Sequence, residues 1–111
     1  MKPASYLILH FLIIVFTLLA LQIASAQTNG TWTNATSTSA WSNAANWSGG
    51  IVADGTDAIA DFSTLDIGAN RTVNLGTNRT IGSLIFGDAV TSSNTWTLAH
   101  GTGGPWTLTL Q

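Results

Sequence analysis

The sequence predicts an all-β protein, a short parallel β-helix (solenoid) of about two to three coils. Beyond the N-terminal segment, apolar residues do not recur at the three-and-four spacing of an amphipathic helix. Thr, Val, Ile, Trp and Phe instead fall in short runs separated by Gly, Asn and Asp, a pattern typical of short strands and tight turns. These runs also recur at a nearly constant interval, as expected of stacked repeats.

Residues 1–26 are predicted to form a signal peptide helix. Lys2 supplies a positive charge, residues 6–21 are almost wholly apolar, and residues 24–26 (ASA) match the small-x-small cleavage pattern. Cleavage after this pattern leaves residues 27–111, for which we expect no stable membrane insertion. The alternative is an uncleaved anchor, although the apolar run is shorter than the roughly 20 residues that a spanning helix needs.

The remaining chain is polar and weakly acidic. It contains five aspartates and only two cationic side chains, Arg71 and Arg79, because the single lysine of the sequence is Lys2. Nucleic acids and anionic membrane surfaces select for clustered Lys and Arg, so we expect neither as a partner. The sequence has no cysteine, which excludes a disulfide scaffold, a thiolate metal site and a cysteine nucleophile.

Five strands are predicted, at residues 58–63, 72–75, 80–86, 95–99 and 106–110. Their inward side chains are expected to form the core, which would contain Val73, Leu75, Ile81, Leu84, Phe86, Trp96 and Leu98.

An internal repeat connects these strands. Residues 72–75 (TVNL) match residues 95–98 (TWTL) at an offset of 23. At an offset of 22, Ile59 matches Ile81, Phe62 matches Leu84 and Phe86 matches Leu108. Coils of this length stack at about 4.8 Å, which places like residues above one another. A small antiparallel sandwich is the alternative, since strands every eight to twelve residues also suit that fold.

Three tryptophans, Trp32, Trp41 and Trp47, lie in residues 27–50, which we expect to form an N-terminal cap on the coils of residues 51–111. The first coil of a solenoid exposes a strand edge and an open core, and a large aromatic side chain buries about 150 to 250 Å². The alternative is that the three indoles are ligand-binding residues that stack on sugar rings, with a polysaccharide as partner.

Two segments carry a resemblance to a known family. Residues 41–50 (WSNAANWSGG) and 79–88 (RTIGSLIFGD), within a match over residues 31–110, resemble the N-terminal part of bacterial secreted proteins with autotransporter-associated β-strand repeats. The resemblance implies a right-handed β-helix, secreted or held at the cell surface of a Gram-negative-type bacterium. Its implied partners are the rest of a longer passenger or cell-surface components. The long repeat array and terminal anchor of that family are missing, so we expect a truncated set of coils.

No catalytic or metal site is expected, and no cofactor. His100 is the one histidine after the signal peptide, and no G-x-S-x-G motif accompanies it. Asp54, Asp57, Asp61 and Asp66 could pair as glycosidase carboxylates, but there is no Glu and little basic character for such chemistry. The Asp54 to Asp57 run lacks the spacing of known calcium loops. We therefore expect a structural surface protein and no enzyme, with an extracellular carbohydrate-binding module as the alternative.

N-x-S/T triplets begin at Asn29, Asn34, Asn46, Asn70 and Asn78. Such triplets mark glycosylation in eukaryotic secreted proteins. In a chain this rich in Asn and Thr, they are expected from composition alone.

Overall fold

The computed structural model describes residues 26–90 and 93–111. The elements are β1 (Gly30–Thr31), β2 (Thr38–Ala40), η1 (Ala44–Asn46), η2 (Ser48–Gly50), β3 (Gly55–Phe62), β4 (Arg71–Asn74), β5 (Arg79–Phe86), β6 (Trp96–Ala99) and β7 (Leu108–Leu110). The two η elements are 3-10 helices. The predicted signal peptide lies outside these residues, apart from Ala26. Over the described part of the chain, no helix is long and apolar enough to cross a membrane.

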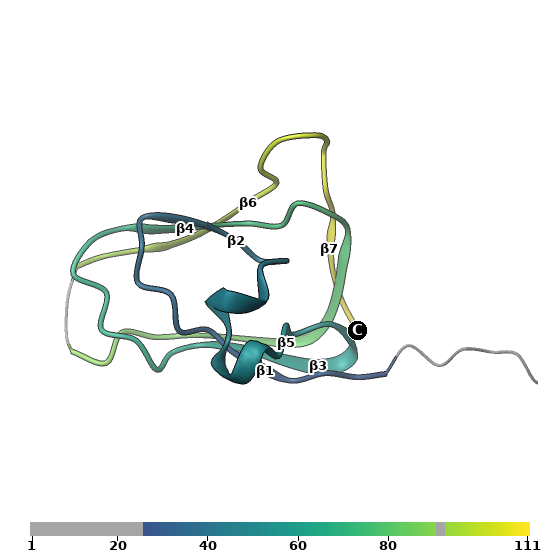
Figure 1. The fold of residues 1–111 in the computed structure, drawn as a ribbon, viewed down its shortest axis with the longest axis horizontal. Coiled ribbons are helices and arrows are strands. Elements are labelled where there is room, and N and C mark those ends of the chain that lie inside the picture. The colour runs from purple at the N-terminus through teal and green to yellow at the C-terminus, as the bar shows by residue number, and fades with distance from the viewer. Residues whose placement is uncertain (1–25, 91–92) are drawn as a thin grey trace, which may run out of the picture.

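The strands form two parallel sheets. The odd-numbered strands make one sheet in the order β1-β3-β5-β7, and the even-numbered strands make the other in the order β2-β4-β6. Each coil of the chain therefore gives one strand to each sheet, and three coils lie one above another before β7 begins a further turn (Figure 1). All pairs between these strands are parallel, which confirms the predicted solenoid and not the antiparallel sandwich.

The predicted repeat offsets are wrong, because both are too short. The sheet registers pair Val73 with Leu98 and Phe62 with Phe86, at offsets of 25 (73 to 98) and 24 (62 to 86). Each error equals the two-residue side-chain period of a strand, so the predicted inward and outward faces of β3, β4 and β5 are preserved. The match of Phe86 with Leu108 is also wrong, because Leu108 pairs with Arg79 at an offset of 29 (79 to 108).

The coil length varies because the corners differ. The offset from β1 to β3 is 30 (30 to 60), and the offset from β2 to β4 is 34 (38 to 72), since η1 and η2 are inserted between β2 and β3. A bulge between Gly55 and Ile59 adds a further irregularity. Coils of unequal length leave no constant repeat in the sequence, and no strand was predicted at β1 or β2.

The core lies in the first two coils and in the facing part of β5. Its buried apolar residues are Trp32, Trp41, Trp47, Ala53, Ala58, Ala60, Phe62, Ile67, Val73, Leu75 and Ile81. This confirms Val73, Leu75 and Ile81 as core residues. The predicted Leu84, Trp96 and Leu98 pack against the core but are only partly buried.

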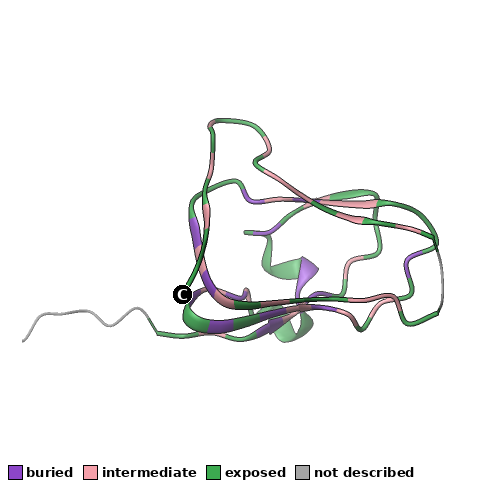
Figure 2. Ribbon diagram, turned by 180° about the vertical axis from the view of Figure 1, so that it is seen from behind, coloured by how far each residue is buried: buried purple, intermediate pink, exposed green. Residues whose placement is uncertain are grey.

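Phe86 was also predicted to be in the core, and this is wrong, because its side chain is 43% exposed. One face of its ring stacks on Phe62 at 5.1 Å between centroids. The next strand, β7, pairs only with the start of β5, from Arg79 to Ile81, so it leaves the other face of Phe86 uncovered. This end of the molecule is less buried as a whole, since β6 and β7 contain no buried residue (Figure 2).

Asparagine side chains extend the parallel ladders at the coil corners. Asn29, Asn70 and Asn78 each precede a strand directly. Their Oδ1 atoms accept hydrogen bonds from the backbone N–H groups of Ile59 (2.8 Å), Thr95 (3.0 Å) and Thr107 (2.9 Å) respectively. Each of these donors precedes the paired residue of the next coil, so each asparagine adds one rung between neighbouring coils.

The other two asparagines of the N-x-S/T triplets are also engaged. Asn34 donates to Oδ1 of Asn46, and Nδ2 of Asn46 donates to the carbonyl of Ala40 at 2.7 Å. All five triplets therefore place their asparagine in the hydrogen-bonding scheme of the coils.

We expect Asn70→Ala to lower the free energy of unfolding by about 0.5–1 kcal/mol, because it removes one rung at an exposed corner. Urea unfolding followed by circular dichroism measures the loss. Asn70→Asp is the matched control, since its carboxylate keeps an acceptor oxygen at the same position and is expected to lose less. Equal losses from the two variants would show that the rung to Thr95 contributes nothing.

Candidate functional site

The three tryptophans named from the sequence converge on Phe62, and these four residues are called the tryptophan cluster. Trp32 follows β1, Trp41 follows β2, and Trp47 lies between η1 and η2. The ring centroids of Trp47 lie 5.1 Å from those of Trp32 and Trp41. All three indoles lie 5.4 to 5.6 Å from Phe62, at the separations that favour edge-to-face and tilted aromatic contacts.

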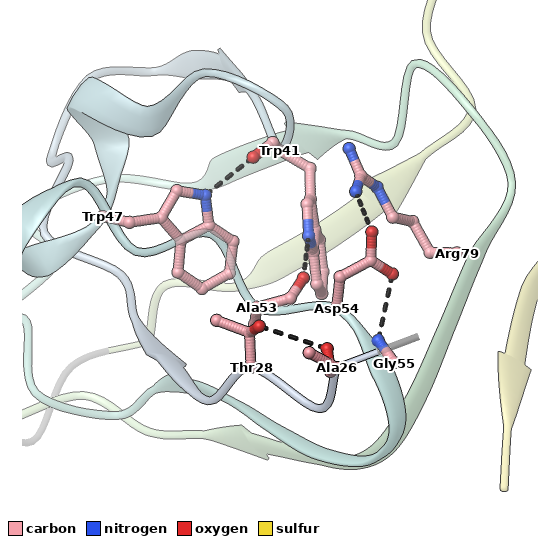
Figure 3. Close-up of polar contacts among 8 residues, drawn as sticks. All are labelled: Ala26, Thr28, Trp41, Trp47, Ala53, Asp54, Gly55 and Arg79. Atoms are coloured by element: carbon pink, nitrogen blue, oxygen red, sulfur yellow. Dashed lines mark hydrogen bonds and ion pairs between the residues drawn. The ribbon is translucent and has the colours of Figure 1, made fainter. Parts of the chain in front are cut away.

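The cluster is buried, and its indole N–H groups are all used. Trp32, Trp41 and Trp47 are 1%, 0% and 2% exposed. Their Nε1 atoms donate to the carbonyls of Asn34 (2.7 Å), Ala53 (2.9 Å) and Trp41 (2.7 Å), the last two of which appear in Figure 3. Stacking on a sugar requires an exposed ring face, so the structure gives no support to these three residues as carbohydrate ligands.

The segment that carries Trp41 and Trp47 reverses its direction after β2. Trp41 continues the β2–β4 ladder through its N–H to the carbonyl of Asn74 (2.8 Å), and Asn43 then caps η1 by accepting from Ala45 N–H. Gly49 and Gly50, at φ 62° and 73°, allow the turn at η2. In Figure 1, the short helix η1 lies inside the outline of the coils, and η2 lies at the edge beside β1.

The returning segment, residues 47–54, runs antiparallel beside residues 28–32. It is bridged at one end by Trp32 with Trp47 and at the other by Thr28 with Asp54. Gly30 allows this close approach, because a Cβ atom there would lie 2.6 Å from the carbonyl oxygen of Ile51 and 2.8 Å from the ring of Trp47.

An ion pair closes the same corner of the molecule. Nη1 of Arg79 lies 2.6 Å from Oδ2 of Asp54, whose Oδ1 accepts from the N–H of Gly55 (Figure 3). The Arg79 side chain is 8% exposed and that of Asp54 is 48% exposed. Nε of Arg79 is buried without a hydrogen-bond partner among the described residues. The pair links the start of β3 to the start of β5, one coil further along.

We expect Asp54→Asn to destabilise the fold by about 1–3 kcal/mol, because it leaves the buried Arg79 charge without its counterion. Asp54 is half exposed, so the loss falls below that of a fully buried pair. Asp61→Asn is the control: Asp61 accepts from the N–H and hydroxyl of Ser63, and the amide keeps an acceptor oxygen. Urea unfolding compares the two variants, and equal small losses would contradict the importance of the ion pair.

The remaining predicted candidates lie apart from the tryptophan cluster. His100 is exposed directly after the end of β6, with its Nδ1 2.6 Å from the carbonyl oxygen of Gly101. Asp57 has a positive φ of 63° in the bulge of β3, and Asp66 is exposed. In residues 26–90 and 93–111, no three His, Cys, Asp or Glu side chains gather in an arrangement that could hold a metal ion.

Comparison of the chain with protein families, with curated proteins and with solved structures finds no match. The site is a buried aromatic cluster beside one partly buried ion pair.

Proposed function

We propose that this chain forms the N-terminal cap and first coils of a longer, exported, right-handed β-solenoid, a structural protein of a Gram-negative-type bacterial surface without catalytic activity of its own. The resemblance of residues 41–50 and 79–88 to proteins with autotransporter-associated β-strand repeats supports this class. The proposal rests on one observation: the outer side of the first coil is covered by other parts of the chain, whereas the outer side of the last coil is not covered by any described residue.

The first coil has its outer side occupied. The last carbonyl of β2, on Ala40, accepts from Nδ2 of Asn46 (2.7 Å) and from the N–H of Asn43 (3.2 Å). Residues 47–54 lie alongside β1. An unprotected edge strand is a template for pairing with other chains, and natural β-proteins cover such edges. The buried indoles and the returning segment therefore support a capping role for residues 27–50.

The opposite end shows no such covering in the described structure. β6 and β7 are the outer strands of their sheets. Phe86 and Leu110, 43% and 60% exposed, present apolar surface there. A following coil would pair with both strands and cover these side chains, as β5 covers β3. We therefore propose that the partner of this end is the next coil of a longer passenger.

The reading frame downstream of the Gln111 codon in the source genome tests the proposal. A frame that continues into further Asn-, Thr- and Gly-rich strand repeats is the expected result. A stop codon directly after Gln111, together with a stable monomer of residues 27–111 in sedimentation experiments, would overturn it, because the open end would then need no partner.

A further inference from the structure

We propose that Gln27 becomes pyroglutamate once it is the first residue of the exported chain, and that the mature protein then contains no primary amine. The inference rests on the export that the proposed function includes, because cleavage after Ala26 must first free the α-amino group of Gln27.

The geometry around Gln27 suits cleavage at this bond. Ala26 and Gln27 are both exposed, whereas the backbone of Thr28 exchanges two hydrogen bonds with Asp54, at 2.9 and 3.0 Å. The fold is therefore anchored one residue after the predicted cleavage position. Cleavage between residues 26 and 27 therefore leaves the bridge between Thr28 and Asp54 in place, and Gln27 becomes an exposed first residue.

The cyclisation needs no other reactant. The α-amine of Gln27 attacks Cδ of its own side-chain amide, a new C–N bond closes a five-membered lactam, and the bond from Cδ to Nε2 breaks. Nε2 leaves as ammonia, so no oxidant or reductant is consumed.

The fold tolerates the loss of this nitrogen. Nε2 of Gln27 donates one exposed hydrogen bond, to the carbonyl of Asp57 at 2.9 Å. The N–H of Asp57 remains bonded to the carbonyl of Gln111 (3.2 Å), and both bonds between Thr28 and Asp54 remain in place. Cyclisation therefore removes one surface contact and leaves the first coil intact.

The chemical consequence follows from composition. Lys2 is the single lysine and lies in the predicted signal peptide, so the α-amine of Gln27 is the sole primary amine of residues 27–111. Its conversion to a lactam leaves no amine for aminopeptidases, aldehydes or reducing sugars. Such inertness suits a protein that is exposed outside the cell.

The test is export of the full-length chain in a Gram-negative host, followed by intact-mass measurement and labelling with an amine-reactive ester. We expect the mass of residues 27–111 less one ammonia, with no label taken up. Gln27→Asn is the matched control, because its shorter side chain cannot close a five-membered lactam on the α-amine. It is expected to show the full mass and one label per chain.

The outcomes separate the two proposals. An N-terminus at Gln27 with the full mass and one label would overturn the cyclisation and leave export standing. Loss of ammonia with a label still bound would also overturn it, because it would place the loss elsewhere, as in an internal Asn29–Gly30 succinimide. A cut at another bond would overturn the cyclisation and leave export standing, whereas an uncut chain would overturn both.

Discussion

Phe62→Ala is expected to lower the free energy of unfolding by about 3–5 kcal/mol, the usual cost of emptying a fully buried aromatic site. Phe62 is 0% exposed, and its ring is the common neighbour of the aromatic residues of both ends. Its centroid lies 5.1 to 5.6 Å from those of Trp32, Trp41, Trp47, Phe86 and Trp96. Removing the ring therefore takes away the aromatic contacts that join the three tryptophans of the first coil to Phe86 and Trp96.

Urea unfolding of residues 27–111, followed by tryptophan fluorescence, measures this loss. Phe86→Ala is the matched control, because it removes the same side chain from a site that is 43% exposed. We expect it to cost about 1–2 kcal/mol, in proportion to the smaller apolar area removed from water. If Phe62→Ala prevents folding, Phe62→Leu replaces it and is still expected to cost more than Phe86→Leu. Equal losses at the two positions would contradict the central place of Phe62.

The fold class was predictable from the sequence because strand periodicity survives errors in register. The strands β4, β5 and β6 were predicted to within one residue at either end. Their pairing was wrong by two residues, which leaves every side chain on its correct face. β1 and β2 were not predicted, because strands of two and three residues have almost no pattern of their own. They are strands because β3 and β4 pair with them.

The candidate site was predictable only in part. The closeness of the three indoles followed from their spacing in residues 27–50, but Phe62 as their common neighbour depends on how one coil stacks on the next. The ion pair joins Asp54 to Arg79 at a sequence separation of 25, and the shorter coil predicted from the repeat does not bring these two side chains together. Because the corner lengths vary, neither the ion pair nor the exposure of Phe86 could be predicted from the sequence.

Trp41→Ala is also expected to lower the free energy of unfolding by about 3–5 kcal/mol. The variant Trp41→Phe separates the part of this loss that comes from the hydrogen bond from the part that comes from packing. Trp41 is 0% exposed, and its Nε1 donates a buried hydrogen bond to the carbonyl of Ala53. Phenylalanine keeps most of the aromatic ring but leaves the Ala53 carbonyl without its hydrogen bond, which lowers the free energy of unfolding by about 1–3 kcal/mol. The further loss on going to alanine measures the packing of the indole against Trp47 and Phe62.

Trp106→Ala is the control for Trp41→Ala, because Trp106 is only partly buried and its Nε1 bond to the Thr102 carbonyl is longer, at 3.3 Å. Urea unfolding by circular dichroism compares the variants without relying on the indole that each one removes. If the cap holds the first coil closed, Trp41→Ala raises the equilibrium constant for unfolding several-fold more than Trp106→Ala does. If the two losses are equal, the tryptophan cluster does not stabilise this end, and residues 27–50 contribute to the solenoid only through β1 and β2.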